Sequence, residues 1–282
     1  MMIMTKTSVA ILAGESPANM MDEALELIGA SELIEPNDKV LIKPNYVAAK
    51  HPSTGITTDT RIVERVIEFV KNSGVSDIIV GEGGAEDTER AFDVVGIRNV
   101  TRQHRVRLVD LNRDSRIQIR IPQALALHEI GISEVALRST CIINIPTLKV
   151  HHIALATLCM KNLMGLILPK SIMHSQINEK IVDLTSLFRN KAKINIVDGL
   201  VGAEVDEVHG RRVEMNLVIA GQDLVAVDSV AAAIMGIDPN KVKYLGLAEK
   251  RGLGISNLKE IEILGKKLEE VERKFRLPPA FK

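Results

Sequence analysis

Short apolar strands that alternate with amphipathic helices are the feature that most constrains the fold of this chain. Residues 8–13 are predicted to form a strand, Pro17 begins a helix that ends near Gly29, and residues 39–43 form a second strand that Pro44 stops. Because a strand, a helix and a strand in this order make a parallel crossover, the sheet is expected to be parallel. The sequence therefore predicts an α/β fold with a mainly parallel, Rossmann-like, doubly wound sheet and helices on both faces.

The rest of the chain continues this alternation. Further strands are expected at residues 77–80, 106–110, 117–121, 141–145, 193–197, 213–220 and 261–265. Helices are expected at residues 60–74, 86–96, 133–139, 155–166, 178–189, 224–236 and 240–252. We interpret residues 1–265 as a single α/β domain that includes a small C-terminal α/β extension, and residues 266–282 as a peripheral helix or tail.

The composition excludes several classes of function. The chain contains 36 basic and 36 acidic side chains and only 2% aromatic residues, which argues against a nucleic-acid-binding protein. Its two cysteines do not make a disulfide framework, a four-cysteine cluster or a zinc site. No apolar run is long enough to span a membrane, and the N-terminus does not read as a signal sequence. We therefore expect a cytoplasmic protein that binds neither nucleic acid nor membrane.

The ends of the predicted strands carry side chains that can bind or titrate. In an open parallel sheet, ligands bind beyond the carboxyl ends of the strands. These ends carry Lys43 and Asn45, Gly81 and Glu82, Asp110 and Asn112, Thr147 with Lys149 and His151, and Asp198 with Gly199. Several independent strand ends thus indicate one ligand-binding crevice at this edge of the sheet.

We expect this crevice to hold a small anion, either a carboxylate or a phosphate. Lys149 and Lys161 lie among apolar residues, where an isolated charge is costly, so each either extends outward to water or faces an anion. Lys43 ends an apolar strand and precedes a long loop, which also suits anion binding. His151 is the candidate acid or base, so the predicted catalytic residues are His151, Lys149 and Lys43.

Polar groups around the lysines are expected to bind the substrate. The glycine-rich turn at residues 81–84 lies between a strand and a helix, where backbone amides can meet a phosphate or a carboxylate. A tight structural turn explains the same glycines equally well. The predicted substrate-binding residues are Asn45, Thr147, Lys161, Asn162, Gly83 and Gly84.

A divalent metal ion is an alternative occupant of the crevice. Glu82, His151 and His174 come from separate loops, and one or two histidines with a carboxylate form an ordinary ligand set. The nearby lysines favour an anion, and the histidines show neither H-x-x-x-H nor H-x-H spacing. The cofactor is therefore left unknown, with a divalent metal on these three residues as the candidate.

Other conspicuous residues have structural explanations. Asp223 precedes an apolar helix and is expected to cap it. Asp228 lies inside that helix, where a buried carboxylate needs a partner such as Lys161. Cys141 and Cys159 are expected in the hydrophobic core.

Several motifs spread along the chain point to a known family. They are IKPN at residues 42–45, GEGG at 81–84, IPTLKVH at 145–151, MKNLMG at 160–165, VDG at 197–199 and AGQDLVAVDSVAAAIMG at 220–236. With these motifs the chain resembles the domain-of-unknown-function family 362 over most of its length. The resemblance implies no established reaction. Some members look like iron-sulfur proteins because they carry a ferredoxin-like segment with clustered cysteines. This sequence has no such cysteine cluster, so it resembles the core domain alone, and no iron-sulfur cluster of its own is expected.

Two classes of function remain open at this point. The first is an enzyme that binds a small anionic molecule in a concave, partly water-excluded pocket. The second is a non-catalytic accessory or scaffold protein for an iron-sulfur or other redox partner, which would need an exposed apolar patch with a basic rim. Nucleotide binding at the glycine-rich turn is a third alternative. The sequence does not decide whether the chain is catalytic or forms a homodimer.

Overall fold

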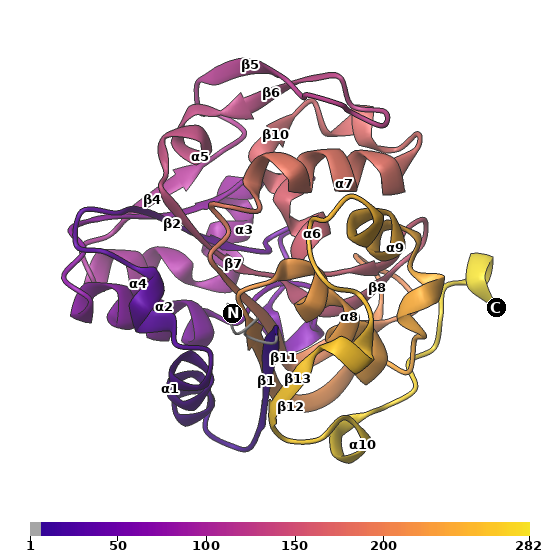
Figure 1. Ribbon diagram of the computed structural model, residues 1–282. Helices are drawn as coiled ribbons and strands as arrows, with labels where there is room; N and C mark the ends of the chain where they lie inside the picture. The colour runs from indigo at the N-terminus through magenta and orange to yellow at the C-terminus, as the bar shows by residue number, and fades with distance from the viewer. Residues whose placement is uncertain (1–6) are drawn as a thin grey trace, which may run out of the picture.

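A computed structural model describes residues 7–282 and is built around one large mixed sheet (Figure 1). Its strands are β1 (Ser8–Ala13), β2 (Lys39–Pro44), β3 (Asp77–Glu82), β4 (Arg107–Asp110), β7 (Cys141–Ile145), β8 (Thr147–His151), β9 (Leu155–Thr157), β11 (Ile194–Glu204), β12 (Arg211–Gly221) and β13 (Glu262–Gly265). The order is β13-β1-β12-β11-β7-β2-β3-β4, and β8 with β9 extends the sheet from β11. The predicted α/β fold with a mostly parallel sheet is confirmed.

The parallel part of the sheet sets one functional edge. The strands β11, β7, β2, β3 and β4 are parallel to one another, so their carboxyl ends face the same way. β12 is antiparallel to both β1 and β11. The predicted crossover connects β1 to β2 through the helix that lies between them in the chain. Within the sheet, the two strands are separated by three others, β12, β11 and β7.

Alternate strand residues pack into two cores, one on each face of the sheet. In β1, Val9 and Ile11 join one core, while Ala10 and Leu12 join the other. The same alternation continues in β2, β3 and β7, because successive side chains of a strand point to opposite faces. Both faces are buried, which explains why these strands read as continuous apolar runs in the sequence.

Helices cover both faces of the sheet (Figure 1). One core includes α1 (Pro17–Leu27), α2 (Thr60–Asn72), α3 (Thr88–Val95) and α4 (Ile97–Gln103), and the other includes α6 (Cys159–Asn162), α7 (Ile177–Phe188), α8 (Leu224–Ile234) and α9 (Lys243–Lys250). The side chains of Ser16, Asp59, Asp87 and Asp223 accept backbone amides of the first turns, which confirms Asp223 as a cap. No helix within residues 7–282 combines the length and the apolar character that a membrane crossing requires.

A smaller sheet packs beside α7. It consists of β5 (Arg116–Arg120), β6 (Glu129–Ser133) and β10 (Ile167–Leu168), and α5 (Glu134–Arg138) follows β6. Asp183 of α7 is buried, and its carboxylate accepts the backbone amides of Leu125, Ala126 and Leu127 at 2.8 Å each. These bonds fix the segment before β6 to the helix, which covers the same side of the large sheet as α8 and α9.

The predicted helix over residues 155–166 is wrong. Leu155–Thr157 forms β9, which pairs antiparallel with β8, and only the short α6 and a 3-10 turn at Leu163–Leu166 follow. β8 itself was not expected as a strand. Cross-strand pairing with distant β11 holds β8 in place, so tertiary hydrogen bonding overrides the local helix propensity of this apolar segment.

β11 also continues past the predicted end at Asp198 and Gly199. A register shift lies between Gly199 and Val201, and beyond it the strand still pairs with β12 up to Glu204. The carboxylate of Asp198 accepts the backbone amides of Asp59 and Leu200 at 2.7 and 3.0 Å. Asp198 therefore fixes the start of α2 against the sheet.

The C-terminal tail is mostly extended. Its helix, α10, covers only Leu268–Val271. The backbone amides of Arg273 and Phe275 donate to the carbonyls of Ile234 and Met235 at 2.8 and 2.9 Å, so the part of the tail after α10 satisfies the end of α8. Phe275 is buried, and β13 joins the main sheet beside β1.

Candidate functional site

The carboxyl ends of β2 and β3, together with β8 and α6, surround a cavity of about 170 Å³ at the predicted edge of the sheet. The polar side chains that line it belong to Asn45, Glu82, Lys149, His151, His152, Thr157, Lys161, Asn162, Lys170, His174 and Glu207, and the glycines Gly83 and Gly84 line it as well. The fold therefore brings most of the predicted site residues together. Lys43 lies behind Glu82, and Thr147 does not line the cavity.

Lys43 and Glu82 form a buried ion pair at this edge of the sheet. The Nζ of Lys43 lies 3.0 Å from each carboxylate oxygen of Glu82 and 3.0 Å from the carbonyl oxygen of Pro44. The backbone amides of Tyr46 and Gly83 donate to the same carboxylate at 3.0 and 2.7 Å. Burial lowers the pKa of Lys43, and the charge of Glu82 opposes this change. Both charged groups thus have their hydrogen-bond partners within the protein.

A chain of buried amides holds Lys149. Its Nζ donates to Oδ1 of Asn45 at 2.8 Å and to the carbonyl oxygen of Ile56 at 2.7 Å. Asn45 in turn donates to Asn162 at 2.8 Å, and Asn162 donates to Asn144 at 2.9 Å. In this chain, Asn45 and Asn162 each accept a hydrogen bond through the amide oxygen and donate one through the amide nitrogen to the next residue. Their dipoles are therefore aligned in the direction that favours the charged form of Lys149.

Asp228 anchors the helix that carries Lys161. Its buried carboxylate accepts the backbone amides of Cys159 and Met160, the first residues of α6, at 2.6 and 3.0 Å. The expected pairing of Asp228 with Lys161 is therefore replaced by backbone amides, which satisfy the carboxylate at the helix N-terminus. Burial raises the pKa of Asp228 to about 7.

Three lysines give the cavity a concentrated positive charge. Burial lowers the pKa of Lys149 to about 7, with the charge of Lys161 acting in the same direction. Burial also lowers the pKa of Lys161 and of Lys170 to about 8. Lys170 donates to Oδ1 of Asn112 at 2.5 Å and to the carbonyl oxygen of Ile167 at 3.4 Å. Within residues 7–282, no acceptor lies within hydrogen-bond distance of the Lys161 amine.

The glycine-rich turn has its backbone amides occupied. Gly83 donates to the carboxylate of Glu82 at 2.7 Å, and Gly84 donates to Oγ1 of Thr88 at 3.0 Å. The next two amides of the turn donate to the carbonyl oxygen of Val47 at 3.0 and 3.2 Å. The turn lines the cavity, but these bonds favour the tight-turn explanation over nucleotide binding at this point.

His151 is held as a neutral imidazole that donates from Nε2. Its Nδ1 accepts the backbone amides of Ile153 and Ala154 at 3.0 and 3.1 Å, which places the ring proton on Nε2. Burial, followed by the charge of Lys161, strongly lowers the pKa of His151. The Nε2 lies 3.5 Å from the Glu207 carboxylate. His151 therefore acts on the cavity as a hydrogen-bond donor at neutral pH.

Among residues 7–282, the group whose ligand atoms gather closely enough for a metal ion is His151, His152 and Glu207. Their ligand atoms lie within 4.8 Å of one another, and Nδ1 of His152 lies 2.5 Å from Glu207. The predicted set of Glu82, His151 and His174 does not gather at one point in the described residues. A metal on Nε2 of His151 would require a proton on Nδ1, where two backbone N–H groups already point. This arrangement opposes metal binding.

Four polar residues that line the cavity were not among the predicted site residues, namely His152, Thr157, Lys170 and Glu207. Lys170 and Glu207 lie in loops whose path depends on β10 and on the β11–β12 hairpin, so no local pattern places them at the site. A basic residue directly after a proline in an apolar segment was the available signal for Lys170. The hydroxyls of Thr157 and Thr147 are buried without a hydrogen-bond partner in the described chain.

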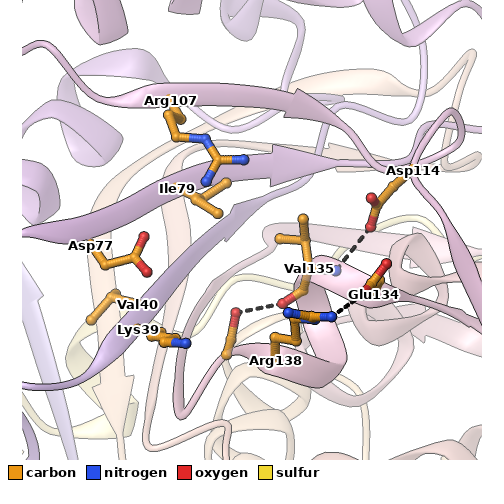
Figure 2. Close-up of a pocket in the computed structure, with 10 residues that line it drawn as sticks. Lys39, Val40, Asp77, Ile79, Arg107, Asp114, Glu134, Val135 and Arg138 are labelled. Carbon is orange, nitrogen blue, oxygen red and sulfur yellow. Dashed lines mark hydrogen bonds and ion pairs between the residues drawn. The ribbon is translucent and has the colours of Figure 1, made fainter.

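A second cavity, of about 370 Å³, lies at the opposite edge of the sheet, at the amino ends of β2, β3 and β4 (Figure 2). Its charged side chains have both signs. Lys39, Asp77 and Arg107 are exposed, and exposed Arg138 pairs with Glu134. A surface depression with balanced and solvated charges explains these observations.

The comparison with known families identifies the family of the chain. The family model described as Domain of unknown function (DUF362) matches residues 40–233, a range that contains every residue lining the lysine-rich cavity. This chain belongs to the DUF362 family. The resemblance noted from the motifs is confirmed, and the DUF362 description carries no reaction.

Two individual proteins are similar to this DUF362 chain. The Thylakoid-associated protein sll1697 of Synechocystis sp. (strain ATCC 27184 / PCC 6803 / Kazusa) is 24% identical over 250 residues, which cover 86% of this chain and 76% of that protein. The lactate racemase apoprotein from Thermoanaerobacterium thermosaccharolyticum aligns with a TM-score of 0.47 and 15% identity over 79% of this chain. The DUF362 chain spans 57% of the length of that racemase.

Proposed function

We propose that this DUF362 protein is an enzyme that binds a small anionic molecule, a carboxylate or a phosphate, in the lysine-rich cavity. The observation that carries the proposal is the charge of the lining. Lys149, Lys161 and Lys170 face one small space, and Glu82 is already neutralised by Lys43. An anion would relieve the cost of burying these ammonium groups.

The size of the cavity limits the ligand. A volume of about 170 Å³ is close to that of cavities of about 150 Å³ that accept benzene, so the ligand has about six non-hydrogen atoms. The concave shape matches the kind of site that an enzyme needs. A small carboxylic acid or inorganic phosphate is of this size.

The contacts suggest a role for each cation. Lys149 and Lys170 are held by Asn45 and Asn112, so both present a fixed ammonium to the ligand. Lys161 has no protein acceptor in the described chain and is the residue able to carry a proton during a reaction. The bonds of Lys43 to Glu82 and Pro44 give it a structural role in place of the predicted catalytic one.

A non-catalytic accessory role for a redox partner receives less support. Such a role would be favoured by one exposed apolar patch with a basic rim. The exposed large apolar side chains come from separate segments of the described chain and are Leu27, Val94, Ile117, Leu125, Ile153 and Ile172. The basic groups of interest lie around a cavity.

Isothermal titration calorimetry with inorganic phosphate, acetate and oxalate tests the proposal. The wild type is compared with Lys161→Met and with the control Lys250→Met, which removes one exposed charge from α9. We expect at least one anion to bind, and Lys161→Met to weaken it about tenfold or more, because a charged hydrogen bond contributes about 1.5–3 kcal/mol. The control should bind like the wild type.

Two outcomes would count against the proposal. One is the absence of binding by all three anions, and the other is equal affinity in the wild type and in a folded Lys161→Met variant. Circular dichroism checks the fold of each variant. Where an anion binds, proton NMR of related small acids incubated with the protein separates an enzyme, which converts one of them, from a binding protein, which converts none.

A further inference from the structure

Lys161 differs from the other lysines of the site in having a free amine. Lys43, Lys149 and Lys170 each donate to two acceptors of the protein, which tie them to the fold. The part of the chain that the structure describes offers no such acceptor to Nζ of Lys161, which lines the cavity. Asp228 fixes the helix that carries Lys161 through two backbone amides, so the position of the side chain does not depend on its amine.

The surroundings of Lys161 increase the fraction of its amine that is uncharged. The side chain is partly buried beside Lys149, and burial lowers the pKa of Lys161 to about 8. The charge of Glu207 opposes this effect. A desolvated lysine next to another cation is the form in which lysine attacks carbonyl groups as a nucleophile.

The remaining groups of the cavity fit a carboxylate next to a carbonyl. Lys149 and Lys170, each fixed by two protein acceptors, offer N–H donors for the carboxylate, and His151 offers another from Nε2. A space of about 170 Å³ accepts about six non-hydrogen atoms. A small 2-oxo acid, such as glyoxylate or pyruvate, combines both groups within this size.

We propose that Lys161 forms a reversible imine with the carbonyl carbon of a small 2-oxo acid held in the cavity. This inference rests on the proposed anion site and names its substrate class. The neutral amine adds to the carbonyl carbon, so that a C–N bond forms and a carbinolamine results. The C–O bond then breaks, and the oxygen leaves as water together with the two protons that the amine carried. The step changes no oxidation state and needs no co-reactant.

Reductive trapping tests the imine on the full chain. Wild-type protein is incubated at neutral pH with glyoxylate and sodium cyanoborohydride, which reduces the imine to a stable secondary amine. We expect peptide mass spectrometry to find one carboxymethyl group, placed on Lys161 before the exposed lysines react. Lys161→Arg keeps the positive charge but has no free amine at neutral pH, so it should lose this adduct. The matched control Lys250→Arg, on the surface of α9, should keep it.

Oxalate makes the test independent of the variants. It resembles the ligand but has no carbonyl that forms an imine, so it should slow the labelling of Lys161 in the wild type. If the wild type binds oxalate but gives no adduct at Lys161, the imine is refuted and the anion site stands. If it neither binds oxalate nor gives the adduct, both proposals fail. Labelling spread over exposed lysines, without preference for Lys161, also refutes the imine.

Discussion

Replacement of Glu82 by glutamine tests whether the pair of Lys43 and Glu82 is a structural support for the cavity. The Lys43 side chain is 0% exposed and that of Glu82 is 3% exposed, so solvent cannot replace the lost charge. Removal of one partner of a buried ion pair costs about 3–5 kcal/mol. The loss of stability in Glu82→Gln should lie at or above the middle of this range, because the backbone amides of Tyr46 and Gly83 also donate to the carboxylate.

Urea denaturation of a double-mutant cycle measures this cost. The cycle contains Glu82→Gln, Lys43→Met and the double variant, and the exposed pair Glu134 and Arg138 supplies the control Glu134→Gln. The double variant should lose less stability than the two single variants together, by about 2 kcal/mol or more, because it leaves no unpaired buried charge. The control should cost less than about 1 kcal/mol.

A free energy of unfolding of Glu82→Gln within about 1 kcal/mol of the wild-type value would refute a structural role for the ion pair. The same holds if the losses of unfolding free energy in the two single variants simply add up in the double variant. Either result would mean that the Lys43 and Glu82 side chains are not coupled in solution.

Three further predictions follow from single contacts. Asp228→Ala leaves two backbone amides of α6 without an acceptor, so urea denaturation should show a loss of about 2–4 kcal/mol. Gly55→Ala should lower the thermal unfolding midpoint, because the backbone has φ +76° and the new Cβ would lie 2.2 Å from the carbonyl oxygen of Gly202; an unchanged midpoint in calorimetry would contradict this. Anion affinity should fall as pH rises through about 7 to 8, since Lys149 and Lys161 bind an anion only below their lowered pKa values; titration calorimetry on both sides of this window checks the sign, and an affinity that does not change with pH would exclude both lysines.

Much of the fold was predictable because local signals and tertiary packing agree. Asp59 and Asp223 cap helices that apolar periodicity also predicts. The buried strands have both faces covered, so their sequences are continuous apolar runs. The helix predicted at residues 155–166 is wrong because the first residues of this segment form backbone hydrogen bonds with β8. The position of β8 depends in turn on β11, which lies more than forty residues further along the chain.

The position of the cavity was predictable from topology, but the roles of the individual side chains were not. The rule that ligands bind beyond the carboxyl ends of parallel strands locates Lys149 and His151 correctly at the cavity. The sequence does not reveal that Lys43 turns to Glu82, or that two backbone amides fix the proton of His151 on Nε2. Such roles depend on side-chain direction and on hydrogen bonds between distant segments, which no periodic pattern encodes.

Bromide soaked into crystals of the protein tests the central claim most directly, because its anomalous scattering identifies an anion without ambiguity. The account predicts a peak inside the cavity, within contact distance of the amines of Lys161 and Lys149. The peak should disappear in crystals of Lys161→Met. A cavity without bromide, with peaks only on the protein surface, would contradict an anion site between these lysines.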